Sequence, residues 1–286
     1  MFPPTSICPR RVLAIFLFLV TAVFPAVCQT NEPPVINANR EIGVSFEPSL
    51  IAYREYVGGA VQDSEHGWIP GIGVNASLIR DTLGIKNFLL NISYDFNTGS
   101  SNHHSKSLTG GSPLAYAAPF RSNDISFGIG KGFLPTSKLL VAPQVGFEYR
   151  EWLRKLPEAL LAIHENYTFW APGAALNVNY NALHALVLKA RVGAEYTVSP
   201  TNANTGNPAR EVPNLTLALG NRPVWQAELG VDWAITGSVH AFADVAYSHF
   251  GFGKSAIASF GNGGAESEPS SVTDLARVHL GLAWCF

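Results

Sequence analysis

The 286-residue chain is poor in charged residues. Asp, Glu, Lys and Arg make up 14% of it, whereas a soluble globular domain carries about 25%. The formal net charge is −2 and the sequence contains no basic cluster, which argues against a nucleic-acid partner. A soluble surface of this size would need many more charges, so the composition disfavours a soluble protein.

Long apolar runs are also scarce. The single long run, 12–24, follows Arg10 and Arg11. Its ~13 residues suit a signal-peptide core and fall short of the ~18–20 that a membrane-spanning helix requires. The spacing of Ala26 and Cys28 predicts cleavage after Cys28. Lipidation of Cys28 and a retained N-terminal anchor are the alternatives, although the large Val27 argues against the first and the polar segment 29–40 against the second.

Cysteine is nearly absent. Of the three cysteines, Cys8 and Cys28 fall in the predicted signal peptide, so only Cys285 remains in the mature chain. We therefore expect no internal disulfide and no cysteine-based zinc site. No cofactor and no metal site are predicted.

Alternation of apolar and polar residues fills the rest of the chain. One segment places Phe88, Leu90, Ile92 and their i+2 successors on one face, and polar residues on the other. Period 2 predicts β-strands, and about ten segments have near the 9–11 residues of a tilted membrane strand. Pro48 interrupts the first, and the sixth changes phase near Pro172. The segments are 42–56, 67–80, 87–97, 121–133, 138–151, 166–180, 185–198, 223–235, 238–249 and 273–286; eight strands is the alternative count.

The connections between these segments alternate between short and long, which is typical of outer-membrane barrels. The long ones are 57–66, 98–120, 152–165, 199–222 and 250–272. Aromatic residues gather at both ends of the strands, as they do at the two membrane interfaces. The long-loop ends carry Tyr53, Tyr56, Trp68, Tyr149, Trp152, Tyr167, Tyr196, Trp225 and Tyr247, and the short-turn ends carry Phe88, Phe133, Tyr180, Trp284 and Phe286.

These patterns predict an all-β fold: a closed antiparallel up-and-down transmembrane β-barrel. Closure follows because an unpaired strand edge has no hydrogen-bond partner in lipid. A soluble sandwich or lipocalin-like barrel would also alternate. Here, however, the polar face is rich in Gly, Ala, Ser and Asn and poor in charge, which favours the membrane barrel.

The last strand, "LARVHLGLAWCF", carries a family resemblance. Its alternating apolar residues and terminal aromatic resemble those of bacterial outer-membrane β-barrels, in particular the small OmpA/OmpX/Opa-like barrels. The resemblance implies location in the bacterial outer membrane, contact with lipid and lipopolysaccharide, and recognition by the barrel-assembly machinery through Val278, Leu280, Leu282, Trp284 and Phe286. The expected organisation is a signal peptide (1–28), an N-terminal lead-in (29–41) and a barrel (42–286). Nothing follows Phe286, so the peptidoglycan-binding domain of larger relatives is not expected.

Ionisable residues on the polar faces are expected to line the lumen. Lys189 or Arg191 is expected to pair with Asp232, and Asp244 with Arg277 or His279. A barrel of eight to ten strands has an interior nearly filled by its own side chains, so the main interpretation is a salt-bridged core that seals the lumen; a narrow gated solute path is the alternative. The predicted lumen network is Glu148, Arg150, Lys189, Arg191, Glu195, Glu228, Asp232, Asp244, Arg277 and His279.

Other motifs are weaker. Ser248 and His249 are adjacent on a strand and should point to opposite faces, so they should not share a proton. His103 and His104 are expected in a solvated loop. Segment 152–163 has helical spacing of apolar residues, with a continuation of the flanking strands, interrupted by Pro157, as the alternative.

The sequence therefore predicts a structural or surface-interaction barrel that could bind an extracellular ligand through its long loops. It is not expected to be an enzyme. A small porin or specific channel is the alternative, and an outer-membrane enzyme, either a lipid A hydrolase or a protease, is a remote one.

Overall fold

The computed structural model describes residues 32–82, 84–106, 113–156, 164–206, 213–259 and 265–286. These residues form one short helix, α2, and seventeen strands. No helix among the described residues is long and apolar enough to cross a membrane. The elements are α2 (Pro34–Asn37), β1 (Glu41–Phe46), β2 (Ser49–Val57), β3 (Ala60–Ile69), β4 (Gly71–Thr82), β5 (Ile85–Lys106), β6 (Pro113–Lys131), β7 (Phe133–Thr136), β8 (Leu139–Lys155), β9 (His164–Leu183), β10 (Leu186–Tyr196), β11 (Val198–Thr205), β12 (Leu215–Ala218), β13 (Pro223–Ala234), β14 (Val239–Phe252), β15 (Ala258–Ser259), β16 (Ala265–Glu266) and β17 (Ser270–Cys285).

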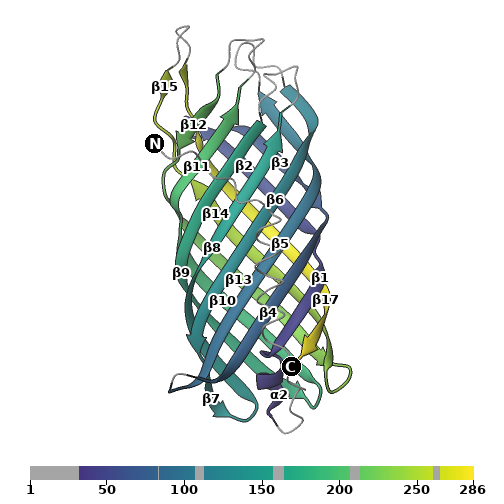
Figure 1. Ribbon diagram of the computed structural model, residues 1–286. Helices are drawn as coiled ribbons and strands as arrows, with labels where there is room; N and C mark the ends of the chain where they lie inside the picture. Colours follow the sequence, from purple (N-terminus) through teal and green to yellow (C-terminus); the bar gives the residue numbers. More distant parts are fainter. Residues whose placement is uncertain (1–31, 83, 107–112, 157–163, 207–212, 260–264) are drawn as a thin grey trace.

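Fifteen strands form one sheet, and β15 and β16 form a separate pair. All pairings in the large sheet are antiparallel, and its order is β12-β11-β9-β10-β13-β14-β17-β1-β4-β5-β6-β8-β7. In addition, β8 pairs with β9, β2 pairs with β17 and β3, and β3 pairs with β5. Figure 1 shows this sheet as a tall cylinder of tilted strands, with α2 and the C-terminus at the lower end.

The alternation seen in the sequence sets the two faces of the sheet. On β8, Gln144, Glu148 and Arg150 are buried inside, whereas the intervening Val145 and Phe147 are exposed outside. Because successive side chains of a strand point to opposite faces, this pattern gives a polar interior and an apolar exterior.

The sequence predicted ten strands, or eight as the alternative. This number is wrong, because the described residues form seventeen strands. Each predicted segment contains a strand, but several long spans are divided. Residues 47–48 separate β1 from β2, and Pro70 separates β3 from β4. Proline has no backbone N–H to donate to a ladder, which accounts for these two breaks. The remaining additions are short strands such as β12, β15 and β16.

The predicted long loops are also too long. Residues 60–69 form β3, which follows a tight turn at Gly58 and Gly59, both with positive φ (59° and 84°). Strands β5 and β6 continue through most of 98–120. Glu151–Lys155 is strand rather than helix, and the rest of that helix prediction lies outside the described residues. Polar sequence in these regions therefore forms strands rather than loops.

The C-terminal residues correct two expectations. Cys285 is disulfide-bonded, so it is not the lone thiol that was predicted. Phe286 was expected to face lipid but is only 8% exposed, and its backbone N–H donates to the carbonyl of Arg40. It follows the end of β17, beyond the outward row of Leu280, Leu282 and Trp284, which are each at least half exposed.

Candidate functional site in the lumen

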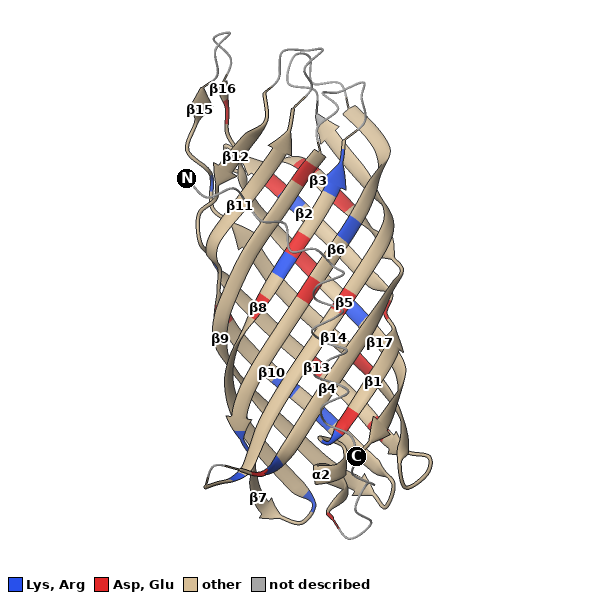
Figure 2. Ribbon diagram, in the orientation of Figure 1, with Lys and Arg blue, Asp and Glu red and all other residues tan. Residues whose placement is uncertain are grey.

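The outer face carries a belt of exposed apolar side chains. Leu229 is 68% exposed and Val44 60%, which is unusual for a protein surface in water. Exposed Trp68, Trp170 and Trp225 lie toward one end of the strands and Trp233 and Trp284 toward the other. Charged residues instead occur along the height of the sheet (Figure 2), and many of them are buried inside it.

Some predicted interface aromatics face inward. Tyr53, Trp152 and Tyr167 are at most 3% exposed and pack on one another in the lumen. Their assignment to the lipid-facing girdle is wrong. They belong to the inward rows of β2, β8 and β9, where residue type alone did not reveal the face.

An apolar layer lies across the lower end of the lumen. Val35 and Ile36 of helix α2 are buried there, in one cluster with inward residues of the sheet. The Arg40 guanidinium donates to the carbonyl of Ile79 (2.6 Å), which ties the segment after the helix to β4. The sheet residues of the cluster are Ile79, Leu89, Leu140, Ala142 and Val187.

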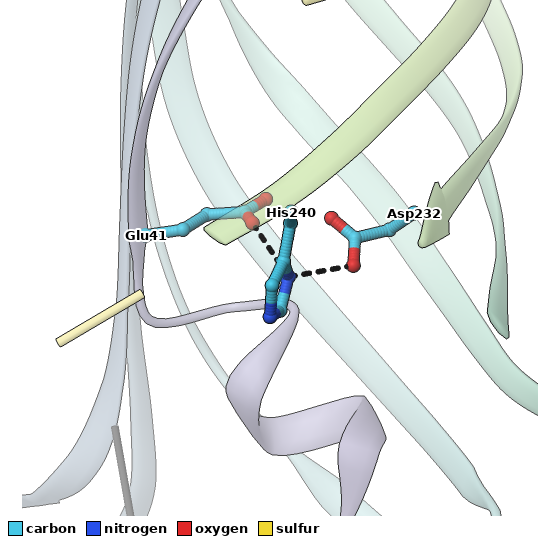
Figure 3. Close-up of side chains that lie close together, drawn as sticks. All are labelled: Glu41, Asp232 and His240. Atoms are coloured by element: carbon cyan, nitrogen blue, oxygen red, sulfur yellow. Dashed lines mark ion pairs between the residues drawn. The ribbon is translucent and has the colours of Figure 1, made fainter. Parts of the chain in front are cut away.

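Four ionisable residues meet just above α2, and Figure 3 draws three of them, Glu41, Asp232 and His240. Lys189 Nζ lies 2.8 Å from Glu41 Oε1 and 3.4 Å from Asp232 Oδ2. His240 Nδ1 lies 2.8 Å from Asp232 Oδ1 and 3.5 Å from Glu41 Oε2. Both carboxylates are 1% exposed. The expected Lys189–Asp232 contact is therefore present, and Glu41, which fell in the predicted lead-in, joins it.

Two arginines organise the middle of the lumen. Arg277 reaches Glu47 (Nε–Oε1, 3.2 Å), Asp95 (Nη1–Oδ2, 3.5 Å) and Asp124. Arg150 contacts Asp124 (Nε–Oδ1, 3.2 Å) and Glu148. The two guanidinium groups thus share the Asp124 carboxylate, and the network links β5, β6, β8 and β17 with Glu47, which lies in the break between β1 and β2.

The pairing expected of Asp244 is absent among the described residues. Arg277 contacts the acids above, and His279 Nε2 lies 3.6 Å from Glu47 and 4.0 Å from Asp95. Arg277 and His279 lie where β17 passes from pairing with β2 to pairing with β1. Both side chains therefore reach Glu47, between those two strands, and Asp95 of β5. Asp244 instead lies over Gly230 of β13.

Arg191 and the glutamates near it form a further group. Arg191 Nη1 donates to Gln226 (2.7 Å), whose amide donates to Glu148 (2.7 Å). Within the described residues, Glu195 and Glu228 have no ion pair within 4.0 Å. All ten predicted lumen residues therefore lie on the inner face, but they belong to several contact groups rather than one.

A polar cavity of about 260 Å³ lies among these groups. Ser, Asn and Gln side chains line it together with Asp95, Glu148, Lys189, Arg191 and Asp244. A polar cavity of this size holds several water molecules. It also borders Ala38 and Asn39, next to helix α2.

A second apolar layer lies above the cavity. The Arg150 guanidinium stacks on Phe250 (4.4 Å from Cζ to the ring centroid), so the mid-lumen network contacts this layer directly. Its residues come from strands all around the sheet, and their rings pack at centroid distances of 4.9–6.4 Å. The members are Ile51, Tyr53, Ile69, Phe120, Trp152, Tyr167, Phe169, Ala171, Leu217, Leu219, Val224, Phe250, Phe252 and Leu275.

Arg154 lies at the level of this upper layer, among four buried glutamates. It contacts Glu55 (Nη2–Oε1, 2.7 Å), Glu65 (Nη1–Oε2, 3.4 Å) and Glu165. Tyr167 links it to Glu268, donating to Oε1 at 2.5 Å. Burial raises the pKa of Glu165, which Arg154 partly offsets, and burial also raises the pKa of Glu268 well above its usual range. We call these five charged residues the upper cluster.

The upper cluster was missed because its residues fall in predicted loops or at strand ends. Glu55 lies two residues from Tyr53, and Glu65 lies four residues from Ile69. Each glutamate is therefore on the same face of its strand as a buried apolar residue, and this spacing could have placed both on the inner face. His103, predicted to be in a solvated loop, is 2% exposed and lies 3.7 Å from Glu65. Its neighbour His104 faces outward and stacks on His66.

Ser248 and His249 point to opposite faces, as expected from their adjacency. Ser248 is 8% exposed and belongs to the inner row, whereas His249 Nδ1 contacts Asp274 on the outer face at 2.8 Å. Tyr247 and Arg54 also bond to Asp274 (2.6 and 2.7 Å). Ser248 and His249 therefore do not form a nucleophile–base pair.

The solved structures that resemble this chain are outer-membrane proteins. The outer-membrane protease OmpT from Escherichia coli matches with a TM-score of 0.64 at 11% identity, covering 86% of this chain and 95% of that chain. The transport unit of the autotransporter AIDA-I from Escherichia coli has a TM-score of 0.49 at 10% identity, with 96% and 97% covered. Ail, the attachment invasion locus protein of Yersinia pestis, has a TM-score of 0.34 at 8% identity, with 86% and 97% covered. No family model and no curated protein matches the sequence.

At these identities the likeness concerns the fold, and of the three structures just named it is OmpT, with a TM-score of 0.64, that supports it. The chain has the all-β antiparallel fold of bacterial outer-membrane β-barrel proteins. This confirms the predicted class of architecture. The solved proteins above belong to the bacterial outer membrane, the location that the sequence predicted.

Proposed function

We propose that this protein is an integral barrel of the bacterial outer membrane whose lumen is occluded, and that it acts through the part of the sheet above the membrane. The observation that carries this proposal is the pair of apolar layers across the lumen, one built on α2 and one on the aromatic residues of the upper layer. The role is structural or one of surface interaction, rather than transport.

The proposed barrel is closed and has ten spanning units. Strands β1 and β2 count as one unit, as do β3 and β4, and β10 and β11, because each pair continues along one path. The pairings support closure, since they run in sequence from β9 through β10, β13, β14, β17, β1, β4, β5, β6 and β8, and β8 pairs with β9. Lipid offers no partner for a free strand edge.

The outer face indicates where the spanning part ends. Along β8, outward Val145 and Phe147 are followed by Glu151 and Lys155. Along β9, the outward residue Trp170 is preceded by Thr168 and Asn166 toward the same end. Charged and amide side chains are costly in lipid, so we infer that the strands continue beyond the outer leaflet. That extension would present the surface for an extracellular ligand.

The proposed partners of the spanning part are lipid, lipopolysaccharide and the barrel-assembly machinery. The apolar belt and its tryptophans support lipid contact. Recognition by the assembly machinery through Val278, Leu280, Leu282, Trp284 and Phe286 rests on the resemblance of the last strand.

Conductance in planar bilayers tests the occluded lumen. We expect the wild-type protein to show no ion-selective openings. A variant that truncates both layers, with Val35→Ser, Ile36→Ser, Trp152→Ala and Phe250→Ala, should conduct, because only the polar cavity then separates the two ends. Trp225→Ala, on the outer face, is the matched control and should stay silent. Wild-type openings whose selectivity changes in Arg191→Ala would overturn the proposal in favour of a small channel.

We propose no catalytic role. The likeness to OmpT concerns the fold, and the protease activity belongs to that protein. At the upper end of this chain, the acid–histidine pair Glu65 and His103 is 0% and 2% exposed, which leaves a peptide substrate no access. A lipid A hydrolase would require a hydroxyl nucleophile beside His249, and Ser248 points the other way.

A further inference from the structure

Glu41, Asp232 and His240 bring three metal-ligating side chains together from three different strands. One oxygen or nitrogen of each lies within 4.8 Å of the others. Glu41 begins β1, Asp232 lies near the end of β13 and His240 near the start of β14, so the site joins β1 to the β13–β14 hairpin, with β17 between them in the sheet, at the lower end (Figure 3). The side chains are 1%, 1% and 3% exposed.

We propose that these three residues bind a divalent transition metal, with Zn²⁺ as the metal of choice. In a tetrahedral zinc site with bonds of about 2.0–2.1 Å, neighbouring ligand atoms are about 3.3 Å apart. The distances from His240 Nδ1 to Asp232 Oδ1 (2.8 Å) and to Glu41 Oε2 (3.5 Å) lie on either side of that value. The site thus needs only small side-chain movements to bind the ion.

Two of the three ligand atoms are buried without a hydrogen bond of regular geometry. Glu41 Oε2 and His240 Nδ1 are shielded from solvent, and within the described structure they meet through the ion pairs given above. A buried polar atom without a well-formed hydrogen bond is unfavourable. Binding of a cation between them would satisfy both atoms at once.

Lys189 holds the carboxylates in the orientation that a metal requires. It contacts Oε1 of Glu41 and Oδ2 of Asp232, the oxygens that face away from His240. The other oxygen of each carboxylate therefore remains directed at the imidazole. Groups that bond the non-ligating atoms orient metal ligands in this way in known metal sites.

The donor set selects the kind of metal. One imidazole nitrogen and two carboxylate oxygens favour Zn²⁺ over Ca²⁺ or Mg²⁺, which take oxygen ligands. The polar cavity borders Glu41 and Lys189, so water can complete the fourth position. Since Glu41 follows the helix α2 segment, the bound metal would anchor that segment to β13 and β14.

A second group of the same composition provides the control. Glu47, Asp95 and His279 also lie within 4.8 Å of one another, and Arg277 contacts both carboxylates there, as Lys189 does at the first group. Their ligand atoms are more widely spaced: His279 Nε2 lies 3.6 Å from Glu47 and 4.0 Å from Asp95, whereas the matching distances at His240 are 2.8 and 3.5 Å. We therefore do not expect this second group to bind metal.

The experiment uses the full chain folded in detergent micelles and freed of metal by a chelator. Co²⁺ is titrated and followed by the visible absorption of a tetrahedral ion, and Zn²⁺ is then added to displace it. We expect one Co²⁺ per chain in the wild type, and at least a ten-fold weaker affinity in His240→Asn and in Asp232→Asn. His279→Asn should bind as the wild type does.

Heat-modifiable gel migration shows whether each variant is folded. Two ligand variants are used so that the test still stands if one of them does not fold. Absence of the absorption in the wild type, or its persistence in both folded variants, would overturn the proposal. So would an equal loss in His279→Asn, because binding would then not depend on this site. Neither the Co²⁺ absorption nor the gel migration depends on whether the lumen conducts ions. A failure of this proposal is therefore distinguishable from a failure of the proposed function.

Discussion

Replacing Arg154 by methionine removes the guanidinium that three buried glutamates share. Arg154 is 2% exposed and contacts Glu55, Glu65 and Glu165. Methionine retains most of the apolar stem, although it loses the stacking of the guanidinium on Tyr53, whose ring centroid lies 4.8 Å from Cζ. The charge on the glutamates is left uncompensated. Removing one partner of a buried ion pair costs about 3–5 kcal/mol, and we expect a loss of that size in the free energy of unfolding.

Arg54→Met is the matched control. Arg54 also pairs with a carboxylate, that of Asp274 at 2.7 Å, but its side chain is 44% exposed. Exposed ion pairs contribute about 0–1 kcal/mol, so this variant should lose less than about 1 kcal/mol.

The loss in Arg154→Met should also depend on pH. Burial raises the pKa of Glu165 and of Glu268. A carboxyl whose pKa is raised on folding holds its proton more tightly in the folded state, so its contribution to stability decreases as the pH rises above the unfolded value. Without Arg154 this effect grows, and the deficit should be larger at pH 8 than at pH 5.

Urea unfolding in phospholipid vesicles, followed by tryptophan fluorescence, measures these free energies at both pH values. A loss in Arg154→Met no larger than that in Arg54→Met would refute the reasoning. A deficit that stays the same or grows at pH 5 would refute the electrostatic part of it.

Three further predictions use the same kinds of assay. Leu229→Arg, in the lipid-facing belt, should lower the free energy of unfolding by about 2–4 kcal/mol, whereas Val57→Arg, above the spanning part and also exposed, should change it by less than about 1 kcal/mol; equal losses would contradict the belt. Deletion of Phe286 should reduce the fraction of heat-modifiable folded protein in outer-membrane preparations, because Phe286 is buried against the N-terminal segment, and an unchanged fraction would argue against this contact. Glu268→Gln should stabilise the protein at pH 8 and have little effect near pH 4, since the neutral amide removes the need to keep a proton on a buried carboxyl; a gain that is independent of pH would exclude this cause.

The fold class could be predicted because period 2 is a local property of the chain. Each strand shows its faces in its own residues, as Val145 and Glu148 do on β8. The extent of the strands could not be predicted in the same way. In the part proposed to lie above the membrane the outward row becomes polar, as with Ser64 and His66 of β3, and the strand then resembles a loop in composition.

The lumen contacts could be predicted only in part, because they depend on which strands face each other across the barrel. Lys189 was matched with Asp232 since β10 and β13 are neighbours in sequence and in space. Its contact with Glu41 joins residues 148 positions apart. No local pattern contains that information, and the same holds for the contacts of Arg277 with Glu47, Asp95 and Asp124.

The pairing of β1 with β17 has a consequence for the time course of folding. Glu41 lies opposite Cys285, so this contact spans nearly the whole chain and is of the highest contact order that the fold contains. Such contacts form late and slowly. Until they form, the edges of β1 and β17 remain open to association with other chains. Assembly of this protein should therefore be limited by the joining of its first and last strands, and a factor that protects those two edges should accelerate it most.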